Sequence, residues 1–161
     1  MNLNKLLLNI FSLNDENWLK HANPCSVWSR FATLPFVVLA VWSRVWIGWY
    51  CLIPVALLMI WIVINPTLFK KPKTFERWSS RAVLGERIYM KRKETPIPSK
   101  HKLPIFILNI LQTISGLILV YGLWDLNVYL TLHGITSIYL SKMWFLDRMV
   151  WLYEDVMEEG K

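Results

Sequence analysis

Apolar residues occur in four long runs, separated by short polar breaks and one long polar segment. The clearest run, residues 45–64, has twenty residues without a formal charge. An α-helix of that length crosses about 30 Å of hydrocarbon. Residues 104–124 form a second uncharged run. A third run stays apolar to Ser141 and continues in helical register through Lys142, so that it predicts a helix over residues 127–146. Unbroken apolar runs of this kind predict membrane helices.

The first run, residues 26–42, is shorter and less regular, with Arg30 near one end and Pro35 inside. A kinked membrane span and a re-entrant helix are both compatible with these residues. We favour a span, because Ser43 and Arg44 then form a short polar turn before the next run. The sequence therefore predicts an all-α, polytopic membrane protein with four transmembrane helices in two hairpins, residues 26–42 with 45–64 and 104–124 with 127–146.

Residues 1–23 carry a weaker apolar pattern before the first run. The spacing of one helix face is kept by Leu3, Leu6, Leu7, Ile10 and Phe11. The apolar stretch is too short for a signal peptide, and no small-residue cleavage site follows it. We expect these residues to form an amphipathic helix that lies in the membrane interface. Together with the spans and the linker, this helix would belong to a single membrane domain of residues 1–161.

The polar segment of residues 66–102 sets the expected orientation. It holds eleven Lys and Arg against three Glu, a net charge of +8. Basic loops of this length stay on the cytoplasmic side of the membrane. We therefore expect this basic linker, the extension of residues 147–161 and both chain ends in the cytoplasm.

Composition supports a membrane protein and excludes several other classes. The chain is 55% hydrophobic and 18% charged, with ten tryptophans, whereas soluble domains carry about 25% charged residues. Intrinsic disorder, a disulfide-rich secreted module and a conventional soluble enzyme are excluded. The sequence contains no phosphate-binding loop, nucleophile elbow, kinase or zinc motif, so it names no cofactor.

Four stretches resemble a family of small prokaryotic integral membrane proteins known only as a domain of unknown function. They are residues 21–30, 42–49, 65–69 and 78–87. The likeness covers roughly residues 18–155, and its most specific part is the block Val-Leu-Gly-Glu-Arg at residues 83–87. The resemblance implies a bacterial or archaeal inner membrane and a shared architecture. It implies no activity.

Two polar residues are expected within the membrane, His133 and Gln112. His133 lies about seven residues into the last helix, roughly 10 Å below the outer surface. An ionisable side chain at that depth marks a functional site by default. A neutral histidine that hydrogen-bonds to a polar stripe on the third helix, including Asn109 and Gln112, explains the same residues. We favour packing, because no second acid or metal ligand lies at this depth.

Carboxylates and imidazoles collect on the expected cytoplasmic face. Asp147 and Glu154 are seven residues apart and share one face of the last helix. The linker adds Glu86 and His101, and His21 precedes the first span. All five are candidate metal ligands, and all except His21 are candidate acids or bases.

Ion pairing is the simpler interpretation of the two carboxylates on the last helix. Scattered charged residues usually form ion pairs rather than sites. We therefore expect Asp147 and Glu154 to dock the basic linker through arginines. The candidate partners are Arg77, Arg81 and Arg87.

The linker also predicts contact with anionic lipid headgroups, at about 1 kcal/mol for each nearby Lys or Arg. Nucleic acid is not expected as a partner, because a segment tethered at both ends to the bilayer meets lipid first. Gly85 is expected to end an amphipathic helix within the linker. The residues expected at the headgroups are Lys70, Lys71, Lys73, Arg77 and Arg81.

The leading functional hypothesis is a structural or accessory membrane protein that binds lipid at the cytoplasmic leaflet. Its protein partners could be other membrane subunits or further copies of itself. The alternative is a membrane-embedded, metal-dependent or metal-free enzyme acting on a lipid-like substrate at the same face. A small transporter or channel ranks third, because the spans hold few charges and lack paired broken helices.

Overall fold

A computed structural model describes residues 15–93 and 96–159. The described residues are helical, with no strand, which confirms the all-α class. The expected amphipathic helix around Leu6 lies outside them, apart from its last residues. The elements are α2 (Asp15–His21), α3 (Pro24–Trp42), α4 (Arg44–Ile47), the 3-10 turn η1 (Gly48–Cys51), α5 (Leu52–Leu68), α6 (Trp78–Met90), α7 (Ser99–Trp124) and α8 (Val128–Glu159).

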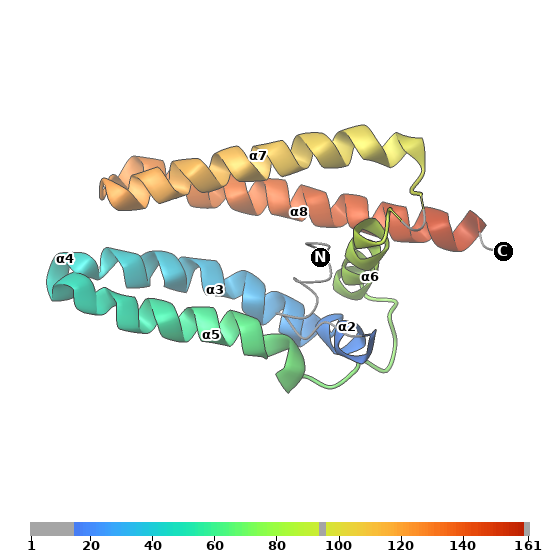
Figure 1. The fold of residues 1–161 in the computed structure, drawn as a ribbon, viewed down its shortest axis with the longest axis horizontal. Coiled ribbons are helices and arrows are strands. Elements are labelled where there is room, and N and C mark those ends of the chain that lie inside the picture. The colour runs from blue at the N-terminus through green and yellow to red at the C-terminus, as the bar shows by residue number, and fades with distance from the viewer. Residues whose placement is uncertain (1–14, 94–95, 160–161) are drawn as a thin grey trace.

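The long helices form two antiparallel hairpins, α3 with α5 and α7 with α8 (Figure 1). The tight turns of both hairpins lie at one end of the molecule, which we call the turn end. Helices α2 and α6 lie at the opposite end, which we call the cap end. The two predicted hairpins are therefore present, and the predicted linker lies at the end expected for it.

The first hairpin is held at the cap end by asparagines. The side chain of Asn23 accepts a hydrogen bond from the Cys25 amide at 2.9 Å and so caps α3, with Pro24 as first residue. The fully buried Asn65 accepts from Ser26 Oγ at 2.8 Å and donates to Ser29 Oγ at 2.9 Å. Because both hydroxyls belong to α3, Asn65 joins the two helices.

The second helix differs from its predicted range of 45–64. It begins at Leu52, because Gly48 has a left-handed φ of 57° and interrupts the helix after α4. It then continues through Pro66 to Leu68. A proline in the last turn removes one backbone hydrogen bond without ending the helix at once.

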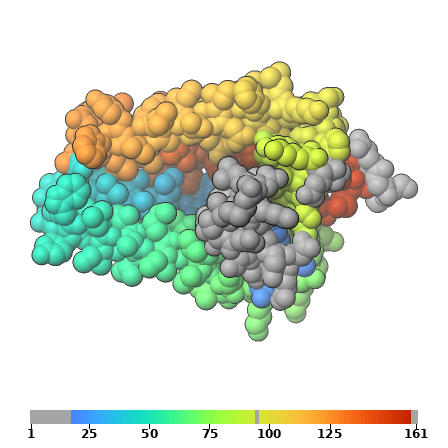
Figure 2. Space-filling model, in the orientation of Figure 1, coloured from blue at the N-terminus to red at the C-terminus, as the bar shows by residue number. Residues whose placement is uncertain are grey.

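The third and fourth helices extend beyond their predicted ranges at the cap end. α7 begins at Ser99 rather than at residue 104, and α8 is continuous from Val128 to Glu159. At the turn end, Arg44 donates hydrogen bonds to the carbonyls of Leu123, at 3.0 Å, and Trp124. A cation is favourable at the C-terminus of a helix. This contact ties the hairpins together where their atoms adjoin in Figure 2.

Helix α6 joins the two hairpins at the cap end. The neighbouring residues Ala82 and Val83 are buried in different clusters, Ala82 against α7 and α8 and Val83 against α2 and α3. Gly85 lies directly on the backbone of Met149, where a Cβ atom would be 1.9 Å from the carbonyl oxygen. The prediction that Gly85 ends a helix is wrong, because α6 continues to Met90. The glycine allows close approach of two helices instead.

The hairpins expose much of their apolar surface. Two stretches of the described residues are long and apolar enough to cross a membrane, Pro24–Leu68, which contains the whole first hairpin, and Ser99–Trp124. Only 6% and 22% of their most apolar segments are buried, whereas the core helix of a soluble protein is mostly buried. Exposed apolar side chains include Leu57, Ile60, Phe106, Leu117 and Val120.

Candidate functional site

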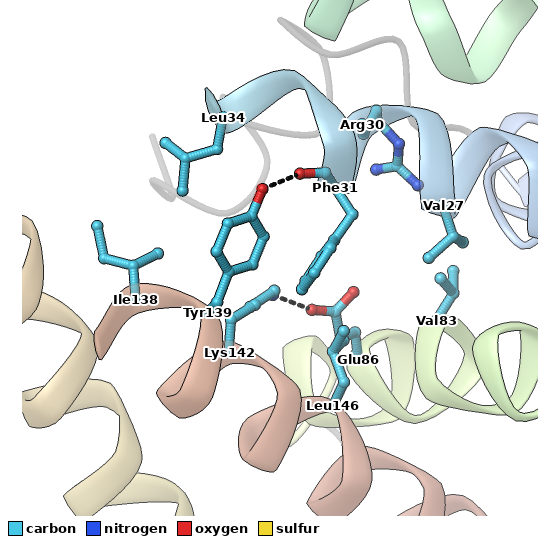
Figure 3. Close-up of a pocket in the computed structure, with 10 residues that line it drawn as sticks. All are labelled: Val27, Arg30, Phe31, Leu34, Val83, Glu86, Ile138, Tyr139, Lys142 and Leu146. Atoms are coloured by element: carbon cyan, nitrogen blue, oxygen red, sulfur yellow. Dashed lines mark hydrogen bonds and ion pairs between the residues drawn. The ribbon is translucent and has the colours of Figure 1, made fainter. Parts of the chain in front are cut away.

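A cavity of about 240 Å³ lies between the two hairpins, beside α6 (Figure 3). Most of its wall is apolar, but charged side chains enter it from three helices: Arg30 from α3, Glu86 from α6 and Lys142 from α8. The described residues that line it are Val27, Arg30, Phe31, Leu34, Val83, Glu86, Ile138, Tyr139, Lys142 and Leu146.

Two of the three charges in this cavity are paired. Lys142 Nζ lies 2.8 Å from Glu86 Oε1. Arg30 has no carboxylate partner among the described residues. It donates from Nε to the Ser26 carbonyl at 3.1 Å and from Nη1 to His21 Nε2 at 2.7 Å. Two cations and one carboxylate leave the cavity with one uncompensated positive charge.

His21 is neutral in this arrangement, since its Nε2 accepts a hydrogen bond from a cation. Burial, with the positive charges of Arg30 and Lys142, lowers the pKa of His21 to about 3. The ring also packs edge-on against Trp18, with centroids 5.4 Å apart. His21 therefore positions the Arg30 guanidinium without neutralising it.

Tyr139 lines the cavity from α8 and contacts α3 across it. Its hydroxyl donates to the Phe31 carbonyl at 2.8 Å, and the two rings are 4.6 Å apart. In a regular helix that carbonyl would accept from the amide of residue 35, but Pro35 has no N–H. The proline thus frees an acceptor on α3 that α8 satisfies.

The two cations lie at the same level. Arg30 is fourteen residues before Arg44, and Lys142 is fourteen residues after Val128, the first residue of α8. At 1.5 Å per residue, each Cα is about 21 Å from the turn end. Arg30 is therefore in the half of α3 nearer the cap end, and Lys142 lies near the middle of the longer α8.

A second cavity of about 340 Å³ lies at the cap end between the start of α7 and the end of α8. His101, which is buried, lies 2.5 Å from Asp155 through Nε2, and Lys100 lies 2.8 Å from the same carboxylate. Hydrogen bonds from Lys100 and His101 hold the pKa of Asp155 below its usual value. Glu154 lines this cavity too.

The match to a known family extends over residues 2–161, nearly the whole chain. The chain belongs to DUF6653, a family of unknown function. This confirms the resemblance to an uncharacterised family. No curated protein and no solved structure matches the chain. The function of this DUF6653 chain must therefore be argued from its own residues.

The ion-pair interpretation of the last helix is confirmed for Glu154. Its Oε1 lies 2.7 Å from Arg81 Nη1, so α8 is docked to α6 of the linker. Asp147 differs from expectation, because it accepts a hydrogen bond from Trp78 Nε1 at 3.3 Å rather than pairing with an arginine. Both carboxylates contact α6.

Replacing Glu154 with glutamine in the DUF6653 chain is expected to loosen the linker modestly. The pair is partly exposed, so its contribution is about 1 kcal/mol or less. Limited proteolysis within residues 69–77 should become faster, while the hairpins stay intact. Replacing Glu158, which has no ion pair among the described residues, provides the matched control. Equal cleavage rates for both variants would contradict the docking role.

The five candidate metal ligands do not form one site. Each has its own partner: His21 contacts Arg30, Glu86 contacts Lys142, His101 contacts Asp155, Asp147 contacts Trp78 and Glu154 contacts Arg81. Within residues 15–93 and 96–159, no three His, Cys, Asp or Glu side chains gather around a possible metal position. Of the four catalytic candidates, only His101 and Glu154 share a cavity.

The two polar residues expected within the membrane are not brought together. His133 is exposed, and no hydrogen bond joins it to a described residue of α7. Gln112 has a buried side-chain nitrogen without a partner in the described part of the chain. The expected hydrogen bond between His133 and this stripe is therefore absent from the described residues.

The expected headgroup cations divide into two groups. Lys70, Lys71, Lys73 and Arg77 are exposed on the loop between α5 and α6. Arg81 is held by Glu154 within the packed part of α6, so it is not free for lipid. Sequence reasoning missed the cavity formed by Arg30, Lys142 and Tyr139. The available signal was a pair of cations inside predicted spans, where ionisable residues are rare.

Proposed function

We propose that this DUF6653 protein is a four-span protein of a prokaryotic inner membrane that binds lipid at the cytoplasmic leaflet as an accessory component. The spans would be α3, α5, α7 and the first twenty or so residues of α8. The apolar faces of both hairpins support this arrangement, because a soluble monomer rarely exposes apolar patches beyond a few hundred Å².

The charge distribution supports a cytoplasmic cap end. The basic linker of residues 66–102, with its net charge of +8, lies there with α6 and the end of α8. The turn end offers little besides Arg44 and Asp125 as charged residues. Positive charge is retained on the cytoplasmic side during insertion. Exposed Lys70, Lys71 and Lys73 would then lie beside anionic headgroups.

The observation that carries lipid binding is the apolar cavity between the hairpins, with its uncompensated cation. Polar and charged groups inside a membrane are costly and mark functional sites. The enzyme alternative receives less support, because Glu86 and Asp147 lie outside the cavity that His101 and Glu154 share. The four catalytic candidates thus lack a common substrate position.

Topology is the direct test. In a chain without its native cysteines, a single cysteine at position 125 should react with a membrane-impermeant maleimide in intact cells. A single cysteine at position 71 should react only after the cells are opened. Of two reporters fused after Lys161, one active only in the cytoplasm and one active only outside it, the cytoplasmic reporter should be the active one.

Detergent-opened cells provide the control, since both cysteines should then label equally. Labelling of position 71 in intact cells would contradict the proposed orientation. A chain released from membranes by salt or alkaline washing would contradict the four-span arrangement itself.

A further inference from the structure

The charged residues of the cavity between the hairpins favour an anionic ligand. Arg30 and Lys142 contribute two positive charges and Glu86 one negative charge, while His21 only accepts a hydrogen bond. If the hairpins span the membrane, this net charge lies in a low-dielectric surrounding. An uncompensated charge there is strongly unfavourable. A bound group with one negative charge would restore neutrality.

The position of the cavity is that of an inner-leaflet headgroup. Arg30 and Lys142 lie about 21 Å from the turn end of a hydrocarbon layer about 30 Å thick. The Arg30 side chain runs toward the cap end, because its guanidinium reaches His21, which precedes α3. Long basic side chains extend in this way toward the membrane surface. The cationic groups therefore approach the level of lipid phosphates.

The size and wall of the cavity fit part of a lipid. A volume of about 240 Å³ corresponds to roughly eight water molecules at 30 Å³ each, enough for a phosphate and a glycerol unit but not for two acyl chains. The chains would continue along the apolar side chains at its rim, such as Leu34 and Ile138, which face each other from α3 and α8.

We propose that Arg30 and Lys142 bind the phosphate of one anionic phospholipid between the two hairpins, with Glu86 competing for Lys142 when the site is empty. This inference rests on the proposed membrane function and specifies its ligand. Arginine suits the role, because its planar guanidinium donates two parallel hydrogen bonds to a phosphate. Tyr139 and Phe31 form the wall beneath the headgroup.

The test uses the full chain in detergent, titrated with phosphatidylglycerol or phosphatidylcholine of the same acyl chains and followed by native mass spectrometry. We expect one phosphatidylglycerol per chain, bound about tenfold more tightly than phosphatidylcholine. Arg30→Gln should weaken phosphatidylglycerol binding about tenfold or more, since it removes charge-assisted hydrogen bonds. Phosphatidylcholine binding should weaken less, because the choline cation of this lipid already offsets its phosphate charge.

Glu86→Gln distinguishes lipid binding from a purely structural role of the Glu86–Lys142 pair. It frees Lys142 and raises the charge of the cavity, so phosphatidylglycerol should bind several times more tightly. A purely structural Glu86–Lys142 pair predicts lower thermal stability with no gain in affinity. Lys91→Gln is the matched control, because it removes the same charge as Arg30→Gln from an exposed residue directly after α6 that is not one of the expected headgroup cations. The affinity of this variant for phosphatidylglycerol should stay within about twofold of the wild-type value, because solvent and salt screen an exposed surface charge.

Three outcomes would overturn the inference. They are equal binding of the two lipids, equal effects of Arg30→Gln and Lys91→Gln, and displacement of the lipid by glycerol phosphate at the same concentration as by phosphatidylglycerol. The last result would assign the cavity to a soluble phosphate. If Arg30→Gln fails to fold, as judged by size-exclusion chromatography, the Glu86→Gln titration decides. If the lipid titration fails but the cysteine labelling gives the predicted topology, only this ligand assignment is refuted. If the labelling gives another topology, the proposed function is refuted.

Discussion

Replacing Gly85 with alanine should separate α6 from α8 and lower the free energy of unfolding by about 3 kcal/mol, at the upper end of overpacking effects. An alanine Cβ would lie 1.9 Å from the Met149 carbonyl oxygen and 2.6 Å from the carbonyl carbon. Both are backbone atoms, so no change of rotamer relieves the clash. The helices must move apart, and the buried contacts of Ala82 and Met149 would be lost with them.

Thermal unfolding in detergent, together with limited proteolysis of the linker, measures this effect. Gly116→Ala is the matched control, because Gly116 also lies in a helix but a Cβ there meets nothing within 4 Å. That variant should be neutral or slightly stabilising, since alanine is the better helix former by about 1 kcal/mol. Similar melting temperatures for the two variants would show that α6 and α8 are not packed this closely.

Acidification should weaken the junction between α2 and α3 through His21. The pKa of His21 is lowered to about 3 in the folded chain, against about 6.5 in an unfolded one. Between these values the unfolded state binds one more proton than the folded state. Stability is therefore full above pH 6.5 and falls as the pH decreases toward 3. The slope is at most about 1.4 kcal/mol for each pH unit.

The pKa of His21 is lowered because a charged imidazole there would lose its hydration and would be repelled by neighbouring cations. A protonated His21 would be buried and would face Arg30, whose Nη1 lies 2.7 Å from Nε2, with Lys142 also nearby. His21→Gln supplies an acceptor oxygen for Arg30 without a titrating group. Its unfolding free energy, measured by denaturant titration between pH 7 and pH 4, should depend on pH less steeply than that of the wild type. Equal slopes would mean that His21 is already charged or exposed.

Several features of the fold were predictable from local sequence. The apolar runs predicted both hairpins, because helix length and apolar content depend on neighbouring residues alone. Asn23 followed by Pro24 is likewise a local signal, because an asparagine cap and a proline in the first turn favour the start of a helix. The resemblance to a family of unknown function agrees with the family match over residues 2–161.

The candidate site was predictable only in its parts. Arg30 and Lys142 are 112 residues apart in sequence, and nothing local shows that both face one cavity with Glu86. The role of Gly85 depends on which helix crosses it, so a glycine expected to end a helix instead allows Met149 to approach. Likewise, the sequence did not show that Glu154 would pair with Arg81 or that Asp147 would accept a hydrogen bond from Trp78. These contacts join segments that are distant along the chain. Only the packing of the two hairpins around α6 therefore decides which residues the charged side chains and Gly85 contact.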